Sequence, residues 1–502
     1  MSKKIATDFL DKRKELLDVL MMKRLGDLAS KIIIAQIALY FFLFLSPNNK
    51  IFFPSIILFG CYLFWILEDW QQAAWLTLVA ILPFSWGVRS WEFSLSLPFH
   101  FFDLDKQVPF LYFSLSAKFL ISVFLLITLT FVKKKPLLFK RRDLFLFSFL
   151  ILIGISTLNS INTTVSIVGL LDIFQAVVLY YLAIYFLKKR KLIGLTLNVL
   201  FIIAAFEGAW ASAQFILKRP LGRILEESLM VFPYGKRAAE DIFQFRSVGT
   251  FTDPITLGIF LSLLFLPMLS QVIHKNSLIK DQFFKNTTLI LCFLGIVFSL
   301  TRGVWLITFG ASSLFFLYLF RKKYLRTFPK SIILIVITGF FLLLPLVIPR
   351  ILSLQASLWS EYSSVNSRIE LIKEAVVIIR QYPFLGVGLG NFLAAMAQNR
   401  ITQIVWYFFF PVHNLYLLLA AEVGIPATIA FLGFVSVVVI KSFISKTSED
   451  LISLKLGIFG ALLVYFLSSF IYDGVVGVNM QLFFLLLAIL VSLEKRTAGV
   501  NG

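Results

Sequence analysis

Cysteine, histidine and acidic residues are scarce in this 502-residue chain, which has two cysteines, three histidines and 27 acidic residues against 47 lysines and arginines. Cys61 and Cys292 lie in separate apolar segments without paired spacing, which argues against a disulfide framework and against a cysteine metal cluster. The formal net charge is +20, but the basic residues recur as short clusters between apolar segments. Because they form no single patch, nucleic acid is not an expected partner.

Apolar residues, in contrast, are abundant. They make up 59% of the chain and include 57 phenylalanines, which is more apolar surface than a soluble fold could bury. Mostly uncharged runs near the length needed to cross hydrocarbon predict an all-α polytopic membrane protein with about 14 transmembrane helices, in a range of about 12 to 14. The expected spans are 32–46, 51–67, 72–85, 114–132, 144–158, 168–187, 192–216, 254–273, 286–301, 303–320, 331–348, 412–439, 455–472 and 475–493.

The distribution of lysine and arginine predicts the orientation. With the N-terminus in the cytoplasm, most basic residues fall inside, including the runs KKKPLLFKRR, KKRK and RKKYLR. The chain then divides into six expected parts. The first three are a cytoplasmic amphipathic segment (1–31), an N-terminal bundle (32–216) and an extracytoplasmic loop (217–253). The others are a second group of helices (254–348), a large extracytoplasmic loop (349–411) and C-terminal helices (412–493).

The first segment lacks the continuous apolar stretch and the small-residue cleavage site of a signal peptide. Its apolar residues fall near one helical face among charges, which suits a helix on the anionic inner leaflet, although a solvated leader fits equally well.

The two long outer loops are expected to be ordered and functional. In NSRIELIKEAVVIIRQYPFLGVGLGNF (366–392), Ser367 and Glu370 have capping-box spacing, Arg368 falls in the first turn, and Pro383 ends the helix. This pattern predicts an amphipathic helix over the outer face of the bundle. GVGLGN matches neither dinucleotide nor Walker spacing, so we expect a turn that returns the chain to the membrane.

Polar residues gather around the start of the next span. His413 and Asn414 stand together at its mouth, Arg302 lies in a tight outer turn, and Arg246 precedes another span. Boundary arginines often only extend to the interface. Arginines at three positions, Arg246, Arg302 and Arg368, are nevertheless expected on the outer side. Because basic residues usually lie on the cytoplasmic side, this placement indicates a functional site. His100 and His274 have no such context, whereas Asp473 and Glu422 are candidates to line the cavity.

Four segments in this order resemble the O-antigen ligase and O-antigen polymerase superfamily: RSVGTFTDPITLG, SLTRGVWL, the 366–392 stretch and PVHNLYLLLAAEVGIPATIAFLGF. The resemblance covers roughly 245–435. It implies a membrane glycosyltransferase of the bacterial cytoplasmic membrane that moves a glycan from undecaprenyl diphosphate to an acceptor on the outer side. The expected partners are that donor, a glycan, lipid or protein acceptor, and membrane lipids.

The chemistry of the residues suits this task. Guanidinium groups offer charge-assisted hydrogen bonds to a diphosphate leaving group, whose charge grows as the glycosidic bond breaks. We therefore expect Arg302 and Arg368 to be catalytic, with His413 as the base for the acceptor hydroxyl, because the positive end of a helix dipole favours neutral imidazole. Residues expected to contact substrate are Arg246, Asn414, Asn391 and Tyr416.

Several alternatives stay open at this point. His413 could instead bind the diphosphate or have only a structural role. No cofactor or metal is expected, although Asp103 and Asp105 in FFDLDKQ form the D-x-D pair that holds a divalent metal in other glycosyltransferases. The acceptor distinguishes a ligase, a polymerase and a protein O-glycan ligase, and the sequence does not identify it. A glycolipid transporter would need paired halves or interrupted helices, and no internal repeat is evident.

Overall fold

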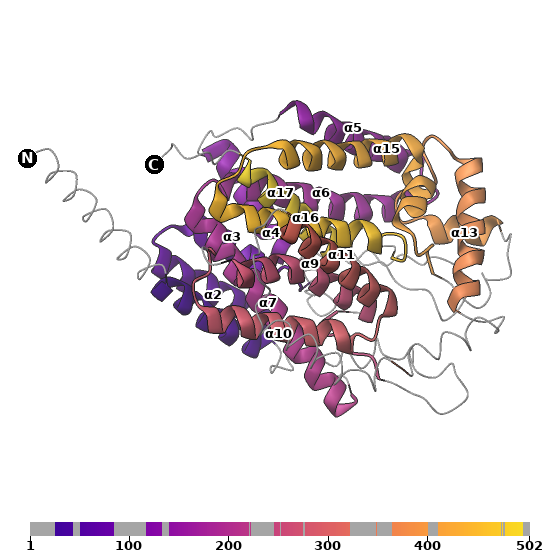
Figure 1. Ribbon diagram of the computed structural model, residues 1–502. Helices are drawn as coiled ribbons and strands as arrows, with labels where there is room; N and C mark the ends of the chain where they lie inside the picture. Colours follow the sequence, from indigo (N-terminus) through magenta and orange to yellow (C-terminus); the bar gives the residue numbers. More distant parts are fainter. Residues whose placement is uncertain are drawn as a thin grey trace, which may run out of the picture.

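The computed structural model describes residues 26–43, 51–84, 117–132, 140–219, 221, 245–251, 253–274, 277–321, 348, 364–399, 410–472, 474 and 477–494. These residues form helices and no strands, which confirms the all-α prediction (Figure 1). Long apolar helices lie side by side along a common direction, and one helix crosses the end of the bundle.

Seven described helices are long and apolar enough to cross a membrane, which confirms a polytopic protein but not the expected number of spans. They are Gly26–Leu43, α6 (Thr163–Phe186), α7 (Arg190–Leu217), α9 (Pro254–Ile273), α11 (Arg302–Arg321), α15 (Leu415–Ile444) and Leu451–Ser468 within α16 (Glu449–Ser468). Shorter apolar helices are α2 (Phe52–Leu67), α4 (Ala117–Ile127) with its π-helical continuation Thr128–Val132, α10 (Gln282–Phe298) and α17 (Val478–Leu493). The remaining helices are α3 (Trp70–Ala80), α5 (Leu144–Leu158), α13 (Ser364–Gln381), α14 (Phe392–Asn399) and the short turn Arg141–Asp143. The expected span 331–348 falls almost wholly outside the described residues.

Helix α17 forms the centre of the bundle, since every residue in it except Ser492 is buried. It packs against α6, α9, α15 and α16. Aromatic rings fill the contacts: Phe483 stacks on Tyr465 of α16 at 4.1 Å between ring centroids, and Phe484 stacks on Phe434 of α15. Because lipid is as apolar as these side chains, the rings stabilise the bundle through close van der Waals packing and ring geometry rather than through removal from water.

Helix α13 confirms the predicted helix before Pro383 and lies across one end of the bundle (Figure 1). The predicted start is wrong, however. The helix begins at Ser364, so Ser367 lies inside it, and Glu370 pairs with Lys373 at 2.7 Å rather than closing a capping box. Arg368 consequently lies one turn further along the helix than expected. Helix α13 ends at Gln381, two residues before Pro383, because the residue that precedes a proline is sterically disfavoured from the helical conformation.

The chain segment after α13 docks into a break in α15. Gly424 has φ 84 and ψ 163, values outside the helical region, and Pro426 follows. The backbone of 383–388 fills this break with three hydrogen bonds: Ile425 N donates to Pro383 O, Val387 N to Ala421 O and Gly388 N to Glu422 O. The GVGLGN turn thus returns the chain to the bundle, as expected, but the predicted continuous span 412–439 is interrupted.

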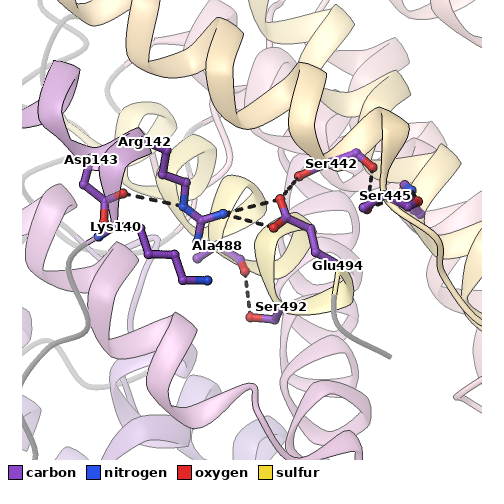
Figure 2. Close-up of polar contacts among 9 residues, drawn as sticks. Lys140, Arg142, Asp143, Ser442, Ser445, Ala488, Ser492 and Glu494 are labelled. Atoms are coloured by element: carbon purple, nitrogen blue, oxygen red, sulfur yellow. Dashed lines mark hydrogen bonds and ion pairs between the residues drawn. The ribbon is translucent and has the colours of Figure 1, made fainter. Parts of the chain in front are cut away.

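A buried ion pair ties together the opposite end of the bundle (Figure 2). Arg142, just before α5, lies 3.1 Å from Glu494, just after α17, and Ser442 of α15 donates a 2.5 Å hydrogen bond to the same carboxylate. Arg142 is only 4% exposed. Because a buried charge is stable only when it is paired, this contact fixes the far ends of α5, α15 and α17.

Candidate active site

Arg302 is the first residue of α11 and follows a tight turn from α10. Leu300 in that turn has φ 47, a left-handed conformation that is costly for a leucine and persists only where neighbours hold it. Trp305 contributes by donating from its indole nitrogen to the Ile296 carbonyl at 2.9 Å. The sequence correctly placed Arg302 between two apolar helices, and the turn fixes its backbone.

Arg246 binds this same turn. Its Nε donates to the Ser299 carbonyl at 3.2 Å, and its Nη2 donates to the Thr301 hydroxyl at 2.9 Å. Thr301 in turn donates to the carbonyl of Pro254, at the start of α9. The predicted neighbourhood of Arg246 and Arg302 is therefore present, and part of the Arg246 guanidinium holds the turn from which Arg302 projects.

Arg368 lies within electrostatic range of Arg302, although the two residues are 66 positions apart and belong to different helices. Burial lowers the pKa of the Arg368 guanidinium below its usual range, and the positive charge of Arg302 lowers it further. Both groups stay protonated at any physiological pH. Two like charges within electrostatic range of each other repel, so an anion between or beside them lowers the energy of this arrangement.

His413 lies two residues before α15 and is partly buried, with its ring centroid 6.3 Å from that of Phe410. Asn414 is the N-cap of the helix: its side-chain oxygen accepts hydrogen bonds from the amides of Tyr416 at 3.1 Å and Leu417 at 3.0 Å. The sequence placed the pair correctly at a helix start. The local reason is that asparagine satisfies amides that the first turn leaves without partners.

The segment that follows α16 contacts the neighbours of both His413 and Arg302. Leu415 N, two residues after His413, donates to Ser469 O at 2.8 Å. Gly303, next to Arg302, packs so closely on Ile471 that an added Cβ would lie 2.4 Å from its Cδ1 atom. The chain neighbours of His413 and Arg302 therefore meet the same short segment, residues 469–471.

Tyr416, Asn391 and Glu422 bind the protein itself. The Tyr416 hydroxyl donates to Phe466 O at 2.9 Å. Asn391 is fully buried, and its side chain bonds both the backbone of Asn162 and the Ser166 hydroxyl of α6. Glu422 is also buried and accepts a hydrogen bond from the first amide of α14. These contacts give the three side chains a part in holding the site, and contact with substrate stays a prediction for Tyr416, Asn391 and Asn414.

Other candidates lie elsewhere. Asp103, Asp105, His100 and Asp473 fall outside the described residues, so the D-x-D hypothesis is untested. Among the described residues, no group of three or more His, Cys, Asp and Glu side chains could hold a metal ion. His274 follows the last residue of α9, at the end of the bundle opposite Arg302.

Comparison with known families supports the geometry. Residues 287–432 match the family model described as O-antigen ligase. The resemblance to the O-antigen ligase superfamily is confirmed. This ligase-like region contains Arg302, Arg368, Asn391 and the His413–Asn414 pair, whereas Arg246 lies outside it. No curated protein matches the chain. The match supports a membrane glycosyltransferase of the bacterial inner membrane, with a lipid-linked glycan and an acceptor as its general partners.

Sequence reasoning missed two polar residues of α7. Glu207 and Gln214 are both fully buried, and both contact the segment that carries Arg246. Their spacing of seven residues places them on one face of an otherwise apolar helix. That spacing was the available signal, because an acid inside a membrane helix is costly and is retained for a reason.

Proposed function

We propose that the protein transfers a glycan from undecaprenyl diphosphate to an acceptor hydroxyl on the outer side of the cytoplasmic membrane. The observation that supports this proposal is that two arginines of the ligase-like region, Arg302 at the turn before α11 and Arg368 on α13 across the end of the bundle, lie within electrostatic range of each other. A diphosphate has the charge that relieves their repulsion, and guanidinium forks suit its oxygens.

In this reaction the acceptor oxygen attacks the anomeric carbon of the donor. A new glycosidic bond forms as the bond from that carbon to the diphosphate oxygen breaks, and undecaprenyl diphosphate leaves with the electron pair. His413 takes the proton of the acceptor hydroxyl. The arginines stabilise the charge that develops on the leaving group, which is where fixed positive charge lowers a barrier most effectively.

Arg246, by this proposal, contributes both to the Arg302 turn and to the diphosphate site. Asn414 and Tyr416 contact the donor or acceptor beside His413 in this proposal. Asn391, predicted from the sequence as a substrate contact, is fully buried and acts instead by holding the turn after α13 against α6. The acceptor defines three variants of the same chemistry: a ligase uses a lipid core, a polymerase uses a second lipid-linked repeat, and a protein ligase uses a serine or threonine side chain.

The test is transfer by purified protein in detergent, where no gradient exists. With an undecaprenyl-diphosphate-linked glycan and each of the three acceptors in turn, we expect release of undecaprenyl diphosphate with one acceptor only. A glycolipid transporter is the competing class, because the break in α15 resembles the interrupted helices of transporters. Movement of intact glycolipid across liposomes, without release of the diphosphate in any arm, would favour the transporter.

A further inference from the structure

The α7 carboxyl group of Glu207 is a buried polar group that the proposed reaction does not use. It is fully buried and lies in an apolar helix. One carboxyl oxygen accepts the amide of Thr250 at 2.9 Å, and the other accepts the hydroxyl of the same threonine at 2.5 Å. Both oxygens therefore bind one residue, and that residue lies four positions after Arg246.

Gln214, seven residues or about two turns further along α7, bonds to the same segment. Its side-chain oxygen accepts the amides of Val248 at 3.2 Å and Gly249 at 2.9 Å, and its nitrogen donates to Gly249 O at 2.8 Å. Gly249 has φ 62, and an added Cβ would lie 2.5 Å from a Glu207 carboxyl oxygen. This turn therefore requires glycine both for its backbone conformation and for its close approach to the carboxyl group.

The hydrogen bonds continue from this segment to Arg302. Ser247 N donates to Phe298 O, the last residue of α10, and Arg246 donates to Ser299 and Thr301 in the turn that follows. Residues 246–250 thus lie between α7 and the α10–α11 turn, and they bond to both. A shift of this segment moves Arg246 directly and removes two contacts from the turn that holds Arg302.

We propose that Glu207 is a positioning residue for the diphosphate site. It fixes residues 246–250 against α7, so that Arg246 can hold the Arg302 turn in the geometry that binds the donor. This inference rests on the proposed function, since it assigns Glu207 an effect on donor binding. Removing the carboxyl group leaves two donors of Thr250 without these acceptors inside a membrane protein, where such a loss shifts the local structure.

The test compares Glu207→Leu, which removes both acceptors, with Glu207→Gln, which keeps one acceptor at the same length. The matched control is Gln36→Leu, because Gln36 is also fully buried and also bonds α7, through Val199 O at 3.2 Å, eight residues before Glu207 on that helix. Two quantities are measured for each purified protein: affinity for the undecaprenyl-diphosphate-linked glycan, and amide hydrogen exchange across residues 245–251.

We expect Glu207→Leu to weaken donor binding about ten-fold or more, whereas Glu207→Gln and Gln36→Leu stay within about three-fold of wild type. Exchange across 245–251 should accelerate only in Glu207→Leu. In an Arg246→Ala background, Glu207→Leu should change donor affinity by less than about two-fold, because it acts through Arg246.

Two binding results would overturn the inference while the proposed function stands. One is donor binding by Glu207→Leu as tight as that of wild type. The other is an equal loss of donor affinity from Glu207→Leu in the wild-type and the Arg246→Ala backgrounds. Unchanged exchange across 245–251 would also overturn it. If wild-type protein does not bind the lipid-linked donor at all, the proposed function fails instead. In that case, faster amide hydrogen exchange across 245–251 in Glu207→Leu than in Gln36→Leu still shows that Glu207 positions the segment.

Discussion

Replacement of Gly386 by alanine tests whether the turn after α13 must dock closely in the break of α15. Gly386 has φ 64, and an added Cβ would lie 2.3 Å from the carbonyl carbon of Glu422 and 2.6 Å from the amide nitrogen of Val423. These are backbone atoms, so rotation of a side chain cannot relieve the clash. The hydrogen bonds from Val387 to Ala421 and from Gly388 to Glu422 lie directly beside it.

The cost follows from two terms. A left-handed conformation costs an alanine about 1–2 kcal/mol, and forcing an extra carbon into packed backbone costs about 1–3 kcal/mol. We therefore expect a loss of about 2–5 kcal/mol, together with a shift of the part of α15 that precedes the break and begins two residues after His413. Gly310→Ala is the matched control, because Gly310 lies in α11 with nothing within 4 Å of an added Cβ. Alanine there should gain about 0.5–1 kcal/mol.

The assay is thermal unfolding of the purified proteins in one detergent, with glycan transfer measured on the same samples. Gly386→Ala should unfold several degrees below wild type and lose transfer, whereas Gly310→Ala should unfold at or above the wild-type temperature with transfer intact. Equal unfolding temperatures for the two variants would show that the turn does not dock as described.

Three further predictions concern charge and topology. Arg302→Lys keeps the charge but loses the planar fork, so transfer should fall at least about ten-fold with normal membrane insertion; wild-type turnover would mean that Arg302 only anchors its turn. Cysteine in place of exposed Lys373 on α13 should react with an impermeant maleimide in spheroplasts, whereas cysteine in place of exposed Lys446 should not, and the reverse pattern would exclude an outward site. Glu494→Ala should destabilise the protein by about 1–3 kcal/mol, because it removes the nearer partner of buried Arg142 and leaves, among the described residues, only Asp143 at 3.6 Å; the triple variant Arg142→Leu, Asp143→Asn and Glu494→Leu should recover most of that loss, and no recovery would argue against the ion pairs as the cause.

Sequence patterns predicted the helices well where apolar runs were long and bounded by charge. The expected segment 254–273 coincides with α9, because Asp253 caps the helix and Pro254 starts it, and both signals are local. The start of α13 was mispredicted for the opposite reason. Ser367 and Glu370 have the spacing of a capping box, but the helix extends three residues earlier and buries Ser367.

Contacts between distant segments could not be predicted from local patterns. The sequence predicted a continuous span over 412–439, and the break at Gly424 is stable because the distant residues 383–388 supply its backbone hydrogen bonds. Likewise, the outward placement of Arg246 predicted a site residue, while its bonds to Ser299 and Thr301 depend on the packing of α7, α9 and α10. Residue type and topology predicted which groups form the site, and only the tertiary contacts show which of these side chains bond to the protein itself.

The most direct test of the proposed transferase is a comparison of wild type with His413→Ala in two measurements on purified protein: binding of the undecaprenyl-diphosphate-linked glycan, and release of undecaprenyl diphosphate in the presence of acceptor. Because the arginines rather than the imidazole hold the diphosphate in this account, the variant should bind donor nearly as well as wild type and release no undecaprenyl diphosphate. Loss of donor binding together with release would make His413 a diphosphate ligand, and full release by the variant would contradict its assignment as the base.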